Sequence, residues 1–198
     1  MPDSLRQSLA ELCRNGSTTL QNLGQIDHDL GVLYAECALS LLKTAQYKPE
    51  DITAIGCHGQ TVWHSPQGSS PFTMQIGDAN IIAARTGVTT IADFRRKDMA
   101  LGGQGAPLVP AYHQVLFTVP DQLTVILNIG GISNISVLPP DANASGYDTG
   151  PGNGLLDAWI EHHQGQRYDI EGAWAKQGSV NEAVLQLLFL TPCVLLTA

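Results

Sequence analysis

The sequence predicts an α/β protein, because short apolar runs typical of buried strands alternate along it with apolar stripes at helical spacing. Hydrophobic residues occupy 43% of the 198 positions and charged residues only 14%, which is enough apolar material for a packed core and too much for intrinsic disorder. Glycine occurs 20 times, above its usual share of about 7%. This excess indicates turns with special dihedral angles, or backbone held close to a ligand.

The first part of the chain is predicted to be helical. Leucines at helical spacing favour an amphipathic helix over residues 4–14, with Asn15-Gly16 as its C-cap. A second, longer apolar stripe predicts a helix from Ile26 to about residues 43–46, ahead of Pro49.

Strand-like segments dominate from residue 52 onward. Four apolar runs bounded by turn residues are predicted to be strands, at residues 52–57, 72–76, 88–92 and 123–129. Between them, Asp78 is expected to cap a helix that ends at Gly87, and Pro107 to open a helix to about Phe117.

The last predicted elements follow the fourth strand. We expect residues 135–138 to pair with that strand as a hairpin through the loop 130–134. Residues 139–145 are predicted to be a loop, and a helix over 154–162 follows the turn at 150–152.

Composition excludes several classes of partner. The formal net charge of -8 at pH 7 argues against nucleic acid, because phosphate backbones bind surfaces rich in Lys and Arg. The four cysteines form no CxxC pair, and no His, Cys and carboxylate set has zinc-ligand spacing. No signal peptide is visible, and the uncharged stretch 183–198 is shorter than the roughly 20 apolar residues of a membrane span. We therefore expect a reducing, cytoplasmic location and no membrane contact.

Five polar or glycine-rich loops follow predicted strands or precede a helix, at residues 56–61, 75–78, 93–98 with 102–105, 128–134 and 148–153. Because ligands of α/β proteins bind outside the carboxyl ends of strands, we expect these loops to form one shared ligand cleft. Each loop also has an ordinary interpretation as turn chemistry.

Two side chains illustrate the alternatives. Asp93 at a strand end either caps the following turn or serves as a general base that takes a proton from water or a hydroxyl. His58 is either a hydrogen-bonded core histidine or a polar contact to a sugar. Surface charge is one interpretation of Arg95 and Asp98, and it is the default interpretation of Arg96 and Lys97.

The glycine pairs are equally ambiguous. Gly130 and Gly131 form either a tight hairpin alone or a backbone surface that a phosphate can approach. Residues 149–153 are either a capped turn or the start of a helix whose free amides suit an anion. No Walker-type phosphate loop, G-x-S-x-G nucleophile motif or dinucleotide-binding fingerprint is present.

Taken in order, the motifs of these loops have a family resemblance. They are Ile55–His64, Gln75–Asp78, Asp93–Asp98 with Gly102–Leu108, Leu127–Asn134, and Gly146–Asn153 with Asp157-Ala-Trp159. Over residues 5 to 182 the sequence closely resembles bacterial anhydro-N-acetylmuramic acid kinases.

The resemblance implies an actin-like (ribonuclease H-like) sugar-kinase fold with ATP and sugar bound between two lobes. Residues 1–122 would belong to the first lobe and residues 123–182 would begin the second. The opening strand with its phosphate hairpin and the downstream adenosine motif of such kinases are not found, so we expect a truncation at both ends and poor phosphate transfer by this chain alone. The apolar tail 183–198 falls outside the resemblance, which is the reason to expect a shifted reading frame near residue 183.

The resemblance also implies the reaction and its residues. Such enzymes recycle peptidoglycan: they open the 1,6-anhydro ring of anhydro-N-acetylmuramic acid with water and move the ATP γ-phosphate to O6. Asp93 would be the catalytic base. The expected ATP-phosphate contacts are Asn128, Gly130, Gly131, Ser133 and Asn134. The expected sugar or phosphate contacts are His58, Gln60, Gln75, Asp78, Asp148, Thr149, Gly150, Gly152 and Asn153. ATP and Mg²⁺ are the expected cofactors, the metal ligands are unassigned, and a homodimer is typical of the family.

Two alternatives remain at this stage. The chain could be a non-catalytic remnant that binds sugar or pairs with another chain through an exposed sheet edge. It could also be a glycoside hydrolase in which Asp93 pairs with Asp98 or Asp148, because the spacing along a sequence does not give the separation of two carboxylates.

Overall fold

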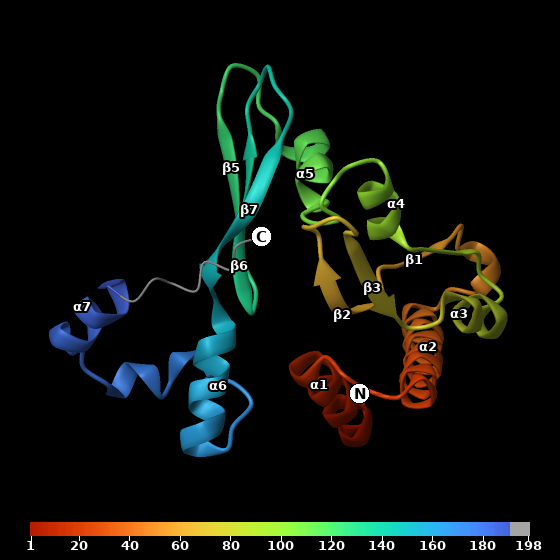
Figure 1. Ribbon diagram of the computed structural model, residues 1–198, viewed down its shortest axis with the longest axis horizontal. Helices are drawn as coiled ribbons and strands as arrows, with labels where there is room; N and C mark the ends of the chain where they lie inside the picture. The colour runs from red at the N-terminus through yellow and green to blue at the C-terminus, as the bar shows by residue number, and fades with distance from the viewer. Residues whose placement is uncertain (191–198) are drawn as a thin grey trace. The chain divides into compact units, whose positions relative to one another are not determined.

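The computed structural model describes residues 1–190, and the chain divides into two units, one ending at Ala106 and one beginning at Pro107 (Figure 1). Helices and strands are mixed in both units, which confirms the prediction of an α/β protein at this level. The predicted division into lobes after residue 122 stays a prediction. Within this chain the helix Val109–Phe117 belongs with the second unit.

Two helices open the first unit. Helix α1 spans Asp3–Asn15 and ends at Gly16 in the left-handed conformation (φ 62°), as predicted. Helix α2 spans Leu20–Ala45. It begins upstream of the predicted start because the Thr19 hydroxyl accepts a hydrogen bond from the Asn22 amide, 3.1 Å away, and thus caps the helix.

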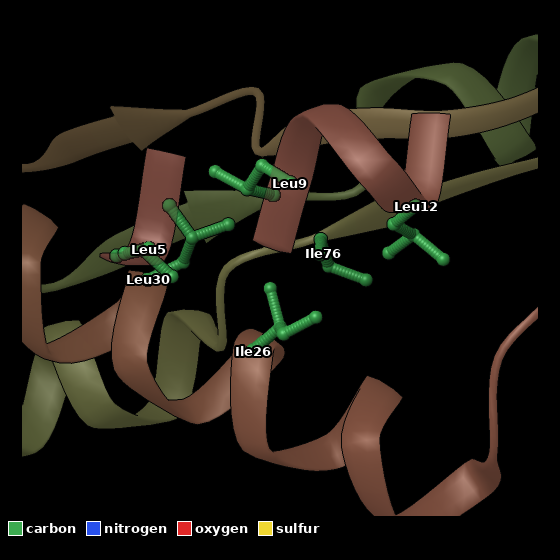
Figure 2. Packing of buried hydrophobic residues seen from close by; sticks show 6 residues of the cluster. All are labelled: Leu5, Leu9, Leu12, Ile26, Leu30 and Ile76. Carbon is green, nitrogen blue, oxygen red and sulfur yellow. The ribbon is translucent and has the colours of Figure 1, made fainter. Parts of the chain in front are cut away.

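The core of the first unit lies between these helices and one strand. The buried cluster consists of Leu5, Leu9, Leu12, Ile26, Leu30 and Ile76 (Figure 2). Each such side chain contributes about 1.5–3 kcal/mol when fully removed from water. This packing fixes α1 and α2 against strand β3, which ends at Ile76.

The strands of the first unit form two small sheets. Strands β1 (Ile55–Cys57) and β4 (Thr90–Ala92) pair in parallel, and strands β2 (Gln60–Ser65) and β3 (Phe72–Ile76) form an antiparallel hairpin. The expectation of a loop over 56–61 was wrong for its second half, which is the start of β2.

Three helical segments connect or follow these strands: the short 3₁₀ helix Pro49–Asp51, α3 (Ala79–Thr86) and α4 (Phe94–Ala100). Helix α3 begins after Asp78 and ends at Gly87, as predicted. The expectation of a loop over 93–98 was wrong, because the chain enters α4 directly after Asp93.

The second unit contains a three-stranded antiparallel sheet in the order β5-β6-β7. Its strands are β5 (Thr124–Ile129), β6 (Ile132–Leu138) and β7 (Ser145–Pro151), and its helices are α5 (Val109–Phe117), α6 (Asn153–Gln164) and α7 (Glu182–Leu190). Two 3₁₀ turns, Ile170–Gly172 and Ala175–Gln177, follow α6.

Three predictions for this unit need correction. The hairpin turn is only Gly130-Gly131, because β6 already begins at Ile132, and β7 was missed. Helix α5 starts at Val109 rather than Pro107, with Pro110 in its first turn.

Helix α5 packs on β6, where a ring nitrogen of His113 lies 2.9 Å from the Ser136 hydroxyl.

The apolar stretch 183–198 falls partly in helix α7, and residues 191–198 lie outside the described part of the chain. Among the described helices, none is both long and apolar enough to cross a membrane.

Candidate functional site

A pocket of about 300 Å³ opens in the first unit. Four of the predicted site residues line it: His58, Gln75, Asp78 and Asp93. Strands β1 and β4 explain this gathering. They are parallel with Cys57 opposite Ala92, so the residues that follow them, His58 and Asp93, leave the same edge of the sheet.

Asp93 has an unusual backbone. Its φ of 60° and ψ of 45° place it in the left-handed region, which few residues other than glycine occupy and which Asp tolerates better than most. Such strain is concentrated at functional sites. Although Asp93 occupies the N-cap position of α4, its side chain makes no capping hydrogen bond, so the turn-capping interpretation does not describe what the carboxylate does.

The Asp93 carboxylate instead binds Arg96. Nε of Arg96 donates to Oδ1 over 2.7 Å, and Nη2 forms an ion pair with Oδ2. The hydrogen bond and the negative charge of Asp93 raise the pKa of the Arg96 guanidinium. Arg96 is exposed, as the default interpretation expected, but it also lines the pocket and holds the predicted base.

Asp27 also lines the pocket, and sequence reasoning missed it. Its Oδ1 accepts a 2.6 Å hydrogen bond from the amide of Gly77, and its backbone carbonyl accepts one from the amide of Asp78. These bonds tie helix α2 to the turn between β3 and α3. The partners lie 50 residues apart along the chain, so no local sequence pattern signals the contact.

Two polar residues of the pocket are held by the strands and helices around it. Oδ1 of Asp78 caps α3 by accepting from the amide of Asn80 at 2.8 Å. The side-chain amide of Gln75 donates to the hydroxyls of Thr73 (2.7 Å) and Thr61 (3.1 Å). A ligand would therefore meet Gln75 through its carbonyl oxygen, because both amide hydrogens are in use.

Gln60 is not brought into the pocket. Its side-chain amide donates to the backbone carbonyl of Thr61. Arg95 and Asp98 are also bound within the protein. Nη1 of Arg95 donates to the carbonyl of Gly105 over 2.9 Å, and Oδ2 of Asp98 accepts from the Gly105 amide over 2.8 Å. Surface charge alone therefore does not describe these two residues, which fasten the loop after α4.

In the second unit, the predicted phosphate hairpin contacts the predicted loop before α6. The amides of Gly152 and Gly154 donate to the carbonyl of Gly131 (2.9 and 3.1 Å). The amide of Asn153 donates to the carbonyl of Gly130 (2.8 Å). Of the two interpretations of residues 149–153, these bonds favour the capped turn, because the amides of residues 152–154 are not free for an anion.

A side-chain hydrogen bond and the strand pairing also connect these segments. The Thr149 hydroxyl donates to the carbonyl of Ser133 over 3.1 Å, and strand pairing sets Asn134 opposite Asn128 on one side and Asp148 on the other. The structure thus joins the 128–134 and 148–153 segments within one unit.

Gly152 and Gly131 differ in what explains a glycine at each position. A Cβ on Gly152 would collide with the carbonyl oxygen of Gly130, so packing alone requires this glycine. A Cβ on Gly131 would meet no described atom within 4 Å, and its φ lies outside the left-handed region. Neither crowding within the described chain nor backbone strain explains Gly131.

A larger pocket of about 990 Å³ lies between α6 and the segment 168–178. Trp159, Tyr168 and Trp174 line it, and of the predicted site residues it contains Asn153. Hydrogen bonds from the amides of Trp174 and Ala175 lower the pKa of Asp169 at its edge. The sequence signal for this pocket was the motif Asp157-Ala-Trp159, which by itself indicated only the family resemblance.

No cluster of three or more His, Cys, Asp or Glu side chains in the described part of the chain is arranged to hold a metal ion. The fold and the first-unit pocket together define a mixed α/β protein with a pocket at the carboxyl ends of parallel strands, the place where ligands of α/β proteins usually bind.

Comparison with known sequences makes the class specific. The chain belongs to the anhydro-N-acetylmuramic acid kinase family, whose sequence model matches residues 1–194. The match passes residue 182, so the expected end of the resemblance there is wrong, and the reason for expecting a shifted reading frame is removed.

Individual relatives agree. The anhydro-N-acetylmuramic acid kinase of Pasteurella multocida is 63% identical over 198 residues, which are 100% of this chain and 52% of the relative. The enzyme of that name from Mannheimia succiniciproducens is 60% identical over 192 residues (97% and 51%), and that from Vibrio cholerae is 58% identical over 188 residues (95% and 51%). The chain spans about half the length of the curated relatives that it matches.

Proposed function

We propose that this chain carries the sugar-binding and catalytic-carboxylate part of an anhydro-N-acetylmuramic acid kinase with an actin-like fold. In the proposed reaction, water opens the 1,6-anhydro ring and the γ-phosphate of ATP passes to O6. The products are N-acetylmuramic acid 6-phosphate and ADP. The family membership and the position of Asp93 in the first-unit pocket support this proposal.

Asp93 is the proposed general base. Water attacks C1, the bond from C1 to the bridging oxygen breaks, and that oxygen becomes O6, the acceptor of the phosphoryl group. The water proton passes to the Asp93 carboxylate. The ion pair with Arg96 uses one lone pair on each Asp93 oxygen, which leaves further lone pairs to accept this proton.

The rest of the pocket suits a neutral, hydroxyl-rich ring. Its volume of about 300 Å³ lies at the small end of the range of ligand sites, about 300–1,000 Å³. The carbonyl of Gln75 and the carboxylates of Asp27 and Asp78 are acceptors for sugar hydroxyls.

The β5–β6 hairpin is the proposed site of the ATP phosphates. The open surface at Gly131 lets a phosphate approach the backbone, and Asn128, Ser133 and Asn134 supply polar groups nearby. The amides of residues 152–154 are already bonded to the Gly130-Gly131 turn and are therefore not phosphate donors. The described part of the chain groups no three His, Cys, Asp or Glu side chains around a metal position, so we propose no protein ligands for Mg²⁺.

The test combines binding and turnover on the 198-residue chain. Calorimetry measures affinity for 1,6-anhydro-N-acetylmuramic acid, and release of ADP and of the 6-phosphate measures transfer. We expect Asp93→Asn to keep sugar affinity within a few-fold but to lower turnover by about 10²-fold or more, the usual contribution of a general base. Asp121→Asn is the matched control, because Asp121 shares the φ of 60° but does not line the pocket, and it should behave as wild type.

Each alternative has its own outcome. Sugar binding without transfer favours the non-catalytic remnant, and ring opening without ATP favours a glycoside hydrolase. No observation favours the hydrolase: Asp98 is bonded to the Gly105 amide, and Asp148 lies in β7 of the other unit. Unchanged turnover in Asp93→Asn would remove Asp93 as the base.

A further inference from the structure

We propose that Arg96 selects sugars that carry an acidic group, by binding the carboxylate of the substrate with the edge of its guanidinium that Asp93 does not use. The inference rests on the proposed function, since N-acetylmuramic acid differs from N-acetylglucosamine by a lactyl ether that ends in a carboxylate.

The charges of the pocket single out Arg96. Asp27, Asp78 and Asp93 each contribute a carboxylate to its lining, and Arg96 carries the only permanent positive charge among the lining residues. An anionic group entering the pocket is therefore repelled by the carboxylates and attracted to one side chain. The sugar hydroxyls, as donors, are attracted to the same carboxylates.

The geometry of the ion pair leaves Arg96 able to bind a second anion. A guanidinium has five N–H donors in a planar fork. Asp93 takes Nε and one N–H of Nη2, so Nη1 and the second N–H of Nη2 form another edge of the size that fits a carboxylate. The Arg96 side chain is 68% exposed and lines the pocket, so its guanidinium is open to a ligand there.

Asp93 fixes the orientation of this edge of the Arg96 guanidinium. Because two contacts hold the guanidinium to a carboxylate three residues away, the plane of the fork is fixed before the ligand arrives. A recognition group that is already fixed loses less entropy when the ligand binds.

The experiment compares two sugars by calorimetry: 1,6-anhydro-N-acetylmuramic acid and 1,6-anhydro-N-acetylglucosamine, which lacks the lactyl ether. The wild-type chain should bind the acid at least about tenfold more tightly, as expected for charge-assisted hydrogen bonds. Arg96→Gln should abolish this preference, so that the two sugars bind with affinities within about twofold of each other. Arg96→Lys should keep only part of it, because an ammonium lacks the fork.

Lys97→Gln is the matched control. It removes the same charge from the neighbouring residue of α4, which does not line the pocket, and should keep the wild-type preference. The inference is overturned if Arg96→Gln keeps the preference, if Arg96→Lys keeps all of it, or if Lys97→Gln loses as much. Equal wild-type affinity for both sugars overturns this inference alone, whereas wild-type binding of neither sugar overturns the proposed function with it.

Discussion

Asp93 and Arg96 lie one helical turn apart at the start of α4, and the two positions were unequally visible in the sequence. A carboxylate directly after a strand is a recognisable pattern, so the position of Asp93 at the sheet edge could be predicted. Arg96 could not be separated from Arg95 and Lys97, because its pairing with Asp93 is a contact across one turn of α4, a helix that was not predicted from the sequence. Asp27 was hidden for another reason, since its partner Gly77 is brought near only by tertiary packing.

His64 predicts a pH dependence of stability. Burial first, and the charge of Arg95 second, lower its pKa below the ordinary 6.5, and its Nδ1 lies 3.0 Å from the Thr73 hydroxyl. The folded chain therefore binds fewer protons at this site than the unfolded chain, so its stabilising contribution is present above pH 6.5 and is lost as the pH falls below that value. Urea unfolding of wild type and His64→Gln at pH 7.5 and 5.5 measures this, with a smaller loss expected in the variant. Equal losses in both would contradict the assignment.

At the scale of elements, helix α2 offers two glycines with opposite expectations. A Cβ on Gly31 would lie 2.8 Å from the backbone oxygen of Asp78, whereas a Cβ on Gly24 would meet nothing within 4 Å. Gly31→Ala should therefore destabilise the chain by about 1–3 kcal/mol, since backbone must shift. Gly24→Ala should stabilise it by about 0.5–1 kcal/mol through helix propensity. Chemical denaturation of both variants checks the pair, and a Gly31→Ala chain as stable as Gly24→Ala would show that α2 and α3 are not packed this closely.

The β5–β6 hairpin allows a similar separation of ligand binding from folding. Gly131→Ala places its methyl group in open space, so the melting temperature should stay within about 2 °C while ATP affinity falls several-fold if the phosphates approach there. Gly152→Ala should lower the melting temperature, because its methyl group meets the carbonyl of Gly130. Thermal scans and nucleotide titrations distinguish the two. Wild-type ATP affinity in a folded Gly131→Ala chain would argue against the hairpin as the phosphate site.

The elements also show where sequence patterns were sufficient. Helices α1 and α3 were predicted closely, because apolar spacing and a C-terminal glycine mark each of them. Strand β7 (Ser145–Pro151) was missed because glycine and proline interrupt it, and these are turn signals when no partner strand is known. The start of β2 was hidden in the same way by Gly59.

At the scale of the molecule, one face of the second-unit sheet stays uncovered in the described part of the chain. Val125, Leu127 and Ile129 alternate along β5 and are 50–58% exposed, while α5 packs on the opposite face through Ser136. Strand β5 pairs only with β6 among the described strands, so it also presents an open edge.

This face predicts concentration-dependent self-association of the chain. Leu127→Lys should reduce it by placing a charge in the centre of the apolar strand. Leu101→Lys, at an 80% exposed site of the first unit, should leave it unchanged. Sedimentation velocity over a concentration series measures both variants, and equal association of Leu127→Lys and wild type would place the contact elsewhere. From the sequence we expect an exposed edge where the opening strand of such kinases is not found. The open edge of β5 lies in the second unit and was not predicted, because it depends on the strand order.

Three backbone hydrogen bonds join the Gly130-Gly131 turn to the first residues of α6. Any molecule that displaces this turn must either break those bonds or displace helix α6 together with the turn. If helix α6 moves, Trp159 moves with it, and so does the wall of the pocket between α6 and the segment 168–178. A disturbance at the tip of the hairpin would then change the tryptophan fluorescence of the second unit.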